Sequence, residues 1–389
     1  MNSNDTRSRE QRASLPVYPQ LPLVPARAAG CDIITEDGRH ILDLYGGHAV
    51  TALGYSHPRL TTAIQKQAGE LLFQSNVVAL DVRARAAERL VAVAPEQLTR
   101  CFFVNSGAEA NENALRIAMR ATGRRKVLAI THGFHGRTAA AAAASWNSAK
   151  WYGFPEKPFE VDFIPRDDIE AARALIDETV AAVIFEPVQG LAGAYDLQFD
   201  FVQALRQFTS DCGALLIADE VQCGIGRSGR FFAAEAYAIE PDLLTSAKAL
   251  GGGIPCGAVL CSEVLASHCG HGDLGTTFGG GPVACAAMLA VLDTIADDDL
   301  LQNVRNREIE IREQCITGPV QKIRGMGLLL GLVCDQPANT VRDVLLDHDI
   351  LTGTSSDPHV LRILAPLIIE PQHVRRLAAA LSTIAAVAS

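Results

Sequence analysis

The chain has 389 residues, with 34 basic and 44 acidic side chains and a formal net charge of −10. Hydrophobic residues make up 48% and charged residues 20%, which is typical of a globular protein and excludes a disordered chain. The length allows two or three domains of about 100–200 residues each. Because the net charge is negative and no block of Lys or Arg occurs, we expect no nucleic-acid partner.

The N-terminus and the cysteines indicate the cellular compartment of the protein. The first residues, MNSNDTRSREQRAS, are polar and lack the apolar segment of a signal peptide, so we expect a loose arm. No apolar run reaches the ~18–20 residues that span a bilayer, which predicts a cytoplasmic chain without a membrane partner. Ten cysteines occur without a CxxC pair and are interpreted as reduced thiols. The group His268-Cys269-Gly270-His271 has residue types that bind metals, but it lacks a second pair at zinc spacing, so we expect no metal.

In chain order, the first elements precede residue 100. Residues 15–30 are rich in proline and are expected to be extended. Apolar residues on both sides of Asp37-Gly38 predict a β-hairpin over 32–44. Beyond residue 100, short apolar runs predict buried strands at Cys101–Val104, Val127–Ile130, Ala181–Phe185, Leu215–Ala218 and Gly257–Cys261. Amphipathic stretches between them predict helices near 108–121, 167–177 and 200–211.

This alternation predicts an α/β fold, with a mostly parallel sheet covered by helices on both faces. The pattern changes after about residue 296, where helices are expected near 299–317, 339–348 and 371–387, with strands at 327–333 and 360–364. We therefore predict a large domain over 51–295 and a smaller α+β domain over 296–389. The N-terminal arm and hairpin over 1–50 are expected to pack with the smaller domain.

Polar residues follow four of the predicted strands. Ligands of open α/β sheets bind in the loops beyond the carboxyl ends of the strands. Any one polar loop is ordinary, but four at one edge of a sheet predict a functional site. These loops are 105–109, 131–138, 186–190 and 219–222.

Lys248 has surroundings unlike those of the other five lysines, with apolar residues before it and glycines at 251–253 after it. A lysine in an apolar pocket has a lowered pKa and acts as a nucleophile toward carbonyl groups. The alternative is a lysine whose amine reaches solvent at a strand end. Asp219 ends an apolar strand, where a carboxylate is costly unless it meets a cation. The pyridinium nitrogen of pyridoxal phosphate is such a cation.

Three further features bear on a cofactor. The N–H groups of Ser106, Gly107 and Ala108, at the start of a helix, suit a phosphate, although Ser106 also fits a plain N-cap. The ring of Phe134 suits stacking on a flat cofactor, or a place in the core. Residues 224–229 match GxGxxG, the dinucleotide motif, but they do not lie directly between a strand and a helix, which argues against NAD.

Five motifs then occur in order: NSGAEANE at 105–112, FHGRT at 134–138, EPVQG at 186–190, ADEVQ at 218–222 and TFGG at 277–280. Together they resemble class III pyridoxal-phosphate aminotransferases, within them the acetylornithine/ornithine group. The resemblance covers nearly the whole chain. It implies aminotransferase fold type I, pyridoxal 5'-phosphate as cofactor, and a homodimer.

The resemblance also implies roles for the matching residues. Lys248 would bond covalently to the cofactor and shuttle a proton, Asp219 would hold the ring nitrogen, and Gln222 would contact the ring's phenolic oxygen. Phe134 would stack on the ring, and Thr277 of a second subunit would reach the phosphate. The phosphate itself would be bound by Ser106, Gly107 and Ala108.

Arg137 and Arg362 would bind the two carboxylates of glutamate, and Glu186 would lie in the same substrate pocket. The chain departs from the family at Leu191, where a glutamate is usual, and at Gly281, where an asparagine is usual. Without that glutamate, we expect another partner for Arg362, either a substrate carboxylate, a water, or a side chain at 195–196.

The expected reaction moves a terminal amino group from an N-acetylornithine- or ornithine-like donor to 2-oxoglutarate, giving a semialdehyde and glutamate, as in arginine biosynthesis. The alternatives are an ω-amine (GABA-type) aminotransferase or an aminomutase on the same fold, and a non-catalytic binding paralogue. Lys248 and Asp219 argue against the non-catalytic alternative.

Overall fold

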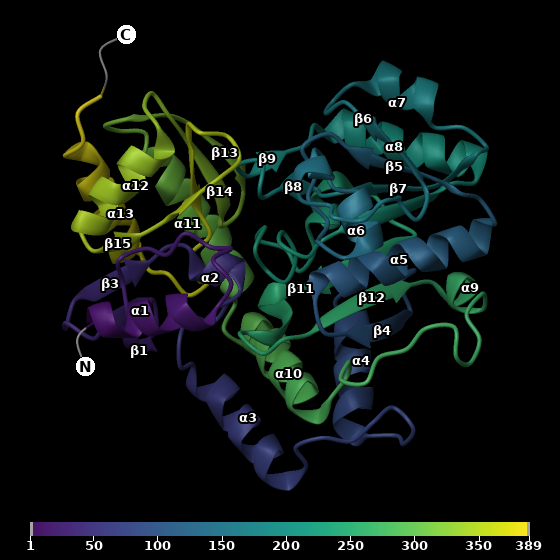
Figure 1. Cartoon of the computed structure of the whole chain (residues 1–389), viewed down its shortest axis with the longest axis horizontal. Coiled ribbons are helices and arrows are strands. Elements are labelled where there is room, and N and C mark those ends of the chain that lie inside the picture. The colour runs from purple at the N-terminus through teal and green to yellow at the C-terminus, as the bar shows by residue number, and fades with distance from the viewer. Residues whose placement is uncertain (1–2, 387–389) are drawn as a thin grey trace.

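The computed structural model describes residues 3–386 and has two lobes of unequal size (Figure 1). The larger lobe is built on a seven-stranded sheet in which only β12 runs antiparallel to its neighbours, so the mostly parallel sheet is confirmed. In spatial order the strands are β4 (Arg100–Val104), β12 (Gly257–Cys261), β11 (Leu243–Ala247), β10 (Leu215–Asp219), β7 (Val180–Phe185), β5 (Lys126–Ile130) and β6 (Glu160–Ile164).

Helices cover both faces of this sheet, because successive strand side chains point to opposite sides. Ile217 packs in the same core cluster as α5 (Gly107–Thr122), whereas its neighbours Leu216 and Ala218 pack in the cluster of α8 (Phe199–Cys212). The other helical elements of this lobe are α3 (Pro58–Glu70), α4 (Asp81–Ala92), α6 (Ala139–Ala143), η1 (Ser148–Lys150), α7 (Ile169–Leu175), η2 (Ala233–Tyr237), η3 (Lys248–Gly251), α9 (Glu263–Ala266) and α10 (Pro282–Asp297).

The smaller lobe contains a four-stranded antiparallel sheet with helices around it. Its strands, in spatial order, are β13 (Val320–Met326), β14 (Leu329–Cys334), β17 (Val360–Ile363) and β16 (Gly353–Thr354). Its helices are α11 (Leu300–Gln314), α12 (Ala338–Asp347) and α13 (Pro371–Ser382).

The predicted N-terminal hairpin is confirmed, and its elements are β1 (Pro25–Ala29), β2 (Asp32–Thr35) and β3 (His40–Asp43). β3 pairs in parallel with β15 (Ile350–Leu351), so the N-terminal strands lie beside the C-terminal elements (purple and yellow in Figure 1). The short elements α2 (Gly46–Ala49), β8 (Val188–Gln189) and β9 (Tyr195–Asp196) lie in loops. The domain limits of 1–50, 51–295 and 296–389 stay a prediction.

Three expectations about elements need correction. The loose arm was wrong, because Ser3–Ala13 forms the polar helix α1, in which Arg, Glu, Gln and Ala favour helix. Strands β6 and β11 were missed, since β6 has only a short alternating pattern and β11 carries Thr and Ser among apolar residues. The helix expected over 371–387 ends at Ser382, and residue 387 lies outside the described residues. Over residues 3–386, the structure has no helix both long and apolar enough to cross a membrane.

Candidate active site

A cavity of about 600 Å³ lies at the edge of the large sheet where the parallel strands end. Four loops that follow β4, β5, β7 and β10 contribute to its lining, as does the residue after β11. The structure therefore brings the predicted polar loops together around one cavity. The predicted site residues among its walls are Ser106, Gly107, Ala108, Phe134, Arg137, Glu186, Asp219, Gln222, Lys248 and Arg362.

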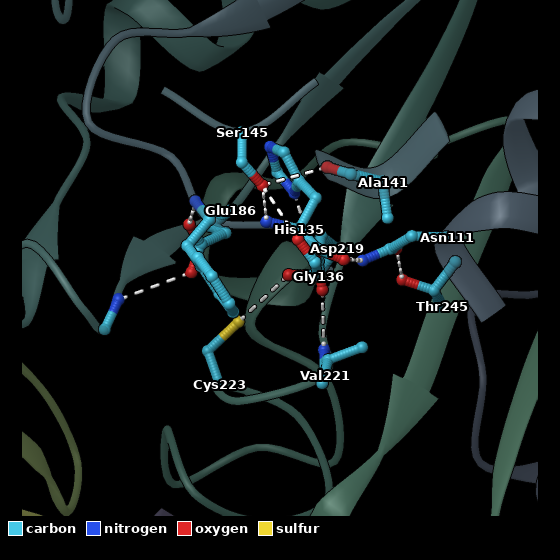
Figure 2. Close-up of polar contacts among 12 residues, drawn as sticks. Asn111, His135, Gly136, Ala141, Ser145, Glu186, Asp219, Val221, Cys223 and Thr245 are labelled. Carbon is cyan, nitrogen blue, oxygen red and sulfur yellow. Dashed lines mark hydrogen bonds and ion pairs between the residues drawn. The ribbon is translucent and has the colours of Figure 1, made fainter. Parts of the chain in front are cut away.

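Asp219, the last residue of β10, is 3% exposed and is held by three neighbours (Figure 2). Its Oδ1 accepts a hydrogen bond from the N–H of Val221 at 3.0 Å. Its Oδ2 accepts one from Asn111 Nδ2 at 2.7 Å and lies 2.7 Å from His135 Nδ1. Both oxygens of this buried carboxylate therefore have polar partners, and the group lines the cavity, where it can meet a cation.

Lys248 follows β11, lines the cavity and opens η3. Its φ of +48° is a left-handed conformation that costs a residue other than glycine, and such strain is retained where the surroundings impose it. Burial lowers the pKa of the Lys248 amine, although the charges of Asp219 and Glu186 act in the opposite direction. A lowered pKa increases the fraction of neutral amine, which is the nucleophilic form.

The start of α5 provides backbone donors at the cavity wall. Ser106 is its N-cap and accepts a hydrogen bond from the N–H of Glu109 at 3.2 Å, so it caps the helix and also faces the cavity. The next N–H groups, of Gly107 and Ala108, lie in the first turn and have no partner within the helix. A Cβ on Gly107 would lie 2.5 Å from Val221 Cγ1, so the close approach there requires glycine. Such a helix N-terminus suits a phosphate.

Phe134 and Gln222 lie in the wall of the cavity, whereas Thr277 does not. The Phe134 ring is 6.1 Å from that of Trp151 and tilted against it. The position of Gln222 depends on Gly190, because a Cβ there would lie 1.6 Å from Gln222 Oε1. Thr277 is exposed in the loop before α10, so within a single subunit it is separate from the site.

Glu186 is a buried acid in the cavity wall. Its carboxylate accepts hydrogen bonds from the N–H groups of Phe134 at 2.8 Å and Gly190 at 3.4 Å. Burial, and then the nearby charge of Asp219, raise the pKa of Glu186 to about 7. Arg137 is exposed, with its guanidinium 5.4 Å from the ring centroid of Trp151.

Arg362 is 4% exposed, and its guanidinium binds three neutral oxygens. It donates to the carbonyl oxygen of Thr354 at 2.7 Å, to that of Gly190 at 3.2 Å and to the hydroxyl of Tyr45 at 2.9 Å. Over residues 3–386, no carboxylate forms an ion pair with it. Burial lowers the pKa of Arg362. Leu191 lines the cavity and is 40% exposed.

Of the alternative partners expected for Arg362, the side chains of Tyr195 and Asp196 are wrong. The Tyr195 hydroxyl donates to Asp167 at 2.9 Å, and Asp196 accepts from the N–H of Gly325 at 2.9 Å. Both residues lie on β9, whose side chains are engaged with other loops. Tyr45, from the N-terminal segment, takes this role instead.

Other residues of the site were missed as participants. Asn111 and His135 both contact Asp219, and Thr245 contacts Asn111. His48 also lines the cavity, and its ring lies 4.8 Å from that of Tyr45. The sequence feature that could have identified such residues is a polar residue within an apolar segment, such as Thr245 in the strand β11, which is fully buried.

The GxGxxG segment at 224–229 has no part in a dinucleotide motif. It lies in turns after β10 and leads into the 3₁₀-helix η2, not into an α-helix. Arg227 within it is fully buried and contacts the carbonyl oxygens of Leu328 and Ala365.

Pyridoxal phosphate fits this set of residues. Asp219 suits its ring nitrogen, and the N–H groups at the start of α5 suit its phosphate. The ring of Phe134 offers an apolar face, and Lys248 offers an amine of lowered pKa for the aldehyde. The chemistry of these donors and acceptors therefore agrees with the cofactor that the sequence resemblance implies.

Comparisons with known proteins agree with this geometry. The family model for aminotransferase class-III matches residues 15–385. The acetylornithine aminotransferase of Methanocaldococcus jannaschii is 38% identical over 96% of both chains, and that of Streptomyces coelicolor is 42% identical over 90% of this chain and 87% of its own.

Solved structures give the same result. The ornithine aminotransferase from Toxoplasma gondii superposes with a TM-score of 0.92 at 27% identity, over 98% of this chain and 94% of the other. The acetylornithine aminotransferase from Elizabethkingia anophelis has a TM-score of 0.88 at 26% identity, over 98% of both chains. The fold, the cavity and the matches along its length show that this chain belongs to the class III aminotransferases.

Proposed function

We propose that the chain transfers a terminal amino group from an N-acetylornithine- or ornithine-like donor to 2-oxoglutarate, giving a semialdehyde and glutamate. The observation that carries this proposal is one cavity that joins Lys248, the buried carboxylate Asp219 and two guanidinium groups, those of Arg137 and Arg362. The cofactor is pyridoxal 5'-phosphate, which supplies an electron sink for the amino group's carbon when it is bound.

The chain's own residues divide the work around that group. Lys248 would hold the cofactor and then, with its lowered pKa, accept a proton at Nζ and return it. Asp219 would face the ring nitrogen, with Gln222 at the ring's edge and Phe134 against its face. The start of α5 would bind the phosphate through the N–H groups of 106–108.

The two arginines would select the substrates. A planar guanidinium binds a carboxylate through two hydrogen bonds, and the cavity contains one exposed and one buried guanidinium. The acceptor 2-oxoglutarate carries two carboxylates and can engage both Arg137 and Arg362. Glu186 lies between the cofactor residues and Gly190 and completes the substrate pocket.

The names of the relatives support the choice of donor. Those from Methanocaldococcus jannaschii and Streptomyces coelicolor are named acetylornithine aminotransferases. We therefore place the reaction in arginine biosynthesis. The cysteines of the described residues are all free, which supports a reducing compartment, and we propose the cytoplasm.

We also propose that the protein is a homodimer. Large apolar side chains lie exposed around the segment 71–78 and the loop that carries Thr277. Val77 is 90% exposed and Phe278 is 66% exposed, and the rings of Phe73 and Phe278 lie 5.3 Å apart. A second copy would cover this surface and bring Thr277 to the partner's phosphate. Light scattering should give twice 41.5 kDa or a multiple, and an active monomer would contradict the proposal.

A panel of amine donors tests the proposed reaction. Each donor is incubated with the holoenzyme and 2-oxoglutarate, and glutamate is measured. We expect glutamate from donors of the ornithine type. Glutamate only from short ω-amines without an α-carboxylate would favour an ω-amine aminotransferase, and no glutamate from any donor would exclude a transaminase.

A further inference from the structure

A chain of buried hydrogen bonds leads from Thr245 through Asn111, which lines the cavity, to Asp219 (Figure 2). The hydroxyl of Thr245 donates to Asn111 Oδ1 at 2.7 Å. The Nδ2 of Asn111 then donates to Asp219 Oδ2 and to the carbonyl oxygen of His135, both at 2.7 Å. Thr245 is 0% exposed and Asn111 is 1% exposed, so water does not compete for these bonds.

The backbone places Thr245 beside Asp219. The two residues are direct partners in the parallel pairing of β10 with β11, and Asn111 reaches them from α5. Three elements therefore meet at the carboxylate. Asp219, at the end of β10, and Lys248, directly after β11, both line the cavity.

The direction of the Asn111 amide is set by what surrounds it. Its NH₂ group faces two acceptors, the Asp219 carboxylate and the His135 carbonyl, and only its oxygen faces the Thr245 hydroxyl. A reversed amide would place three oxygens together, at Asp219, His135 and Asn111 itself, in a site without water. The Thr245 hydroxyl supplies the donor that the amide oxygen needs in the native direction.

We infer that Thr245, acting through Asn111, is a positioning residue that fixes the direction of the Asp219 carboxylate, and through it the retention of the pyridine ring. This inference rests on the proposed function, in which Asp219 holds that ring. Thr245 does not itself line the cavity, so its effect passes through two hydrogen bonds. Without the hydroxyl, the amide oxygen loses its buried donor, and the donor on Asp219 Oδ2 is no longer held in place.

The experiment compares Thr245→Val with Ser246→Ala. Valine keeps the volume of threonine and removes only the hydroxyl. Ser246 is the next residue of β11 and is also 0% exposed, and its Oγ has no hydrogen-bond partner over residues 3–386, so it is a matched control. The readouts are the dissociation rate of the cofactor from the holoenzyme, the pH dependence of the bound cofactor's absorption spectrum, and the KM for the amino donor.

For Thr245→Val we expect cofactor dissociation to be about tenfold faster and the spectrum to titrate at a shifted pH, with a KM for the donor within about twofold of wild type. Ser246→Ala should match wild type in all three measurements. Equal dissociation rates and spectra for the two variants would overturn the inference. A wild-type protein that binds no pyridoxal phosphate would instead overturn the proposed function.

A second pair of variants covers the case in which valine prevents folding. Thr245→Ser and Thr245→Ala have similar volumes and differ in the hydroxyl. We expect Thr245→Ser to retain the wild-type spectrum and Thr245→Ala to show the faster dissociation. If both behave alike, the hydroxyl does not position Asp219 and the inference is wrong.

Discussion

Leu191 offers the sharpest test of how the pocket chooses its substrates. It lines the cavity beside Gly190, whose carbonyl oxygen is 3.2 Å from Arg362 Nη1. The substitution Leu191→Glu would place a carboxylate next to a buried guanidinium that binds only neutral oxygens. At a separation of ~4 Å and an effective dielectric constant of ~20, the attraction is ~4 kcal/mol.

That attraction must be reduced for solvent and for side-chain entropy. Leu191 is 40% exposed, so a glutamate there would remain partly hydrated. A net interaction of about 1.4 kcal/mol corresponds to a tenfold change in binding. Because the new carboxylate competes with the substrate for Arg362, we expect the KM for 2-oxoglutarate to rise about tenfold.

The donor should respond in the opposite direction. In the wild-type protein, Arg362 hydrogen-bonds only to neutral oxygens, so we expect it to favour donors with a second carboxylate, such as N-succinylornithine, over plain ornithine. Leu191→Glu neutralises that charge and should shift kcat/KM toward plain or acetylated ornithine. Steady-state assays with each donor and with 2-oxoglutarate measure both effects.

The control is Leu191→Gln, which has nearly the same shape as glutamate and no charge. We expect the glutamine variant to keep the wild-type KM for 2-oxoglutarate within about twofold. If the Glu and Gln variants shift together, the effect is steric and the electrostatic reasoning fails. A wild-type enzyme that prefers plain ornithine, with a ranking that Leu191→Glu leaves untouched, would also refute it.

Three further predictions concern the cofactor site and the buried acid. Lys248→Ala should retain the cofactor through the phosphate-binding residues but lose turnover. Borohydride reduction of the wild-type holoenzyme should label Lys248 in peptide mapping, and a label on another lysine would exclude Lys248 as the residue that bonds to the cofactor. Gly190→Ala should lower kcat at least tenfold, because its Cβ would overlap Gln222 Oε1 and displace that side chain; unchanged kinetics would show that Gln222 is dispensable. In the folded protein, the pKa of Glu186 is raised from 4.5 to about 7, so folding favours its protonated form. The stability that this form contributes is fully present below pH 4.5. It is lost as the pH rises to about 7, by at most ~1.4 kcal/mol per pH unit. The Tm of Glu186→Gln should therefore fall less between pH 5 and 7 than that of wild type, and parallel curves would contradict the raised pKa.

The local sequence pattern was sufficient to predict most strands of the large sheet. The runs at 101–104, 127–130, 181–185, 215–218 and 257–261 all lie within strands, because each is a short apolar segment followed by polar or glycine-rich residues. The same reasoning placed the polar loops at one edge, since parallel strands end on the same side.

Other features depend on contacts between distant parts of the chain. Tyr45 and Arg362 are 317 positions apart, and no local pattern indicates that the tyrosine hydroxyl meets the guanidinium. Thr245 and Asn111 are polar residues on buried faces, and their role is visible only once α5 crosses β11 and β10. Strand β11 was missed because its central Thr245 and Ser246 interrupt the apolar run that would have identified it.

The central claim is that the bound cofactor takes an amino group from an ornithine-type donor and passes it to 2-oxoglutarate. The most direct measurement adds N-acetylornithine or ornithine to the yellow holoenzyme without an acceptor, removes the excess donor, and then adds 2-oxoglutarate. We predict that the donor removes the colour and that 2-oxoglutarate restores it, with about one glutamate formed per subunit. A colour that no ornithine-type donor changes, or one that 2-oxoglutarate does not restore, would contradict the claim.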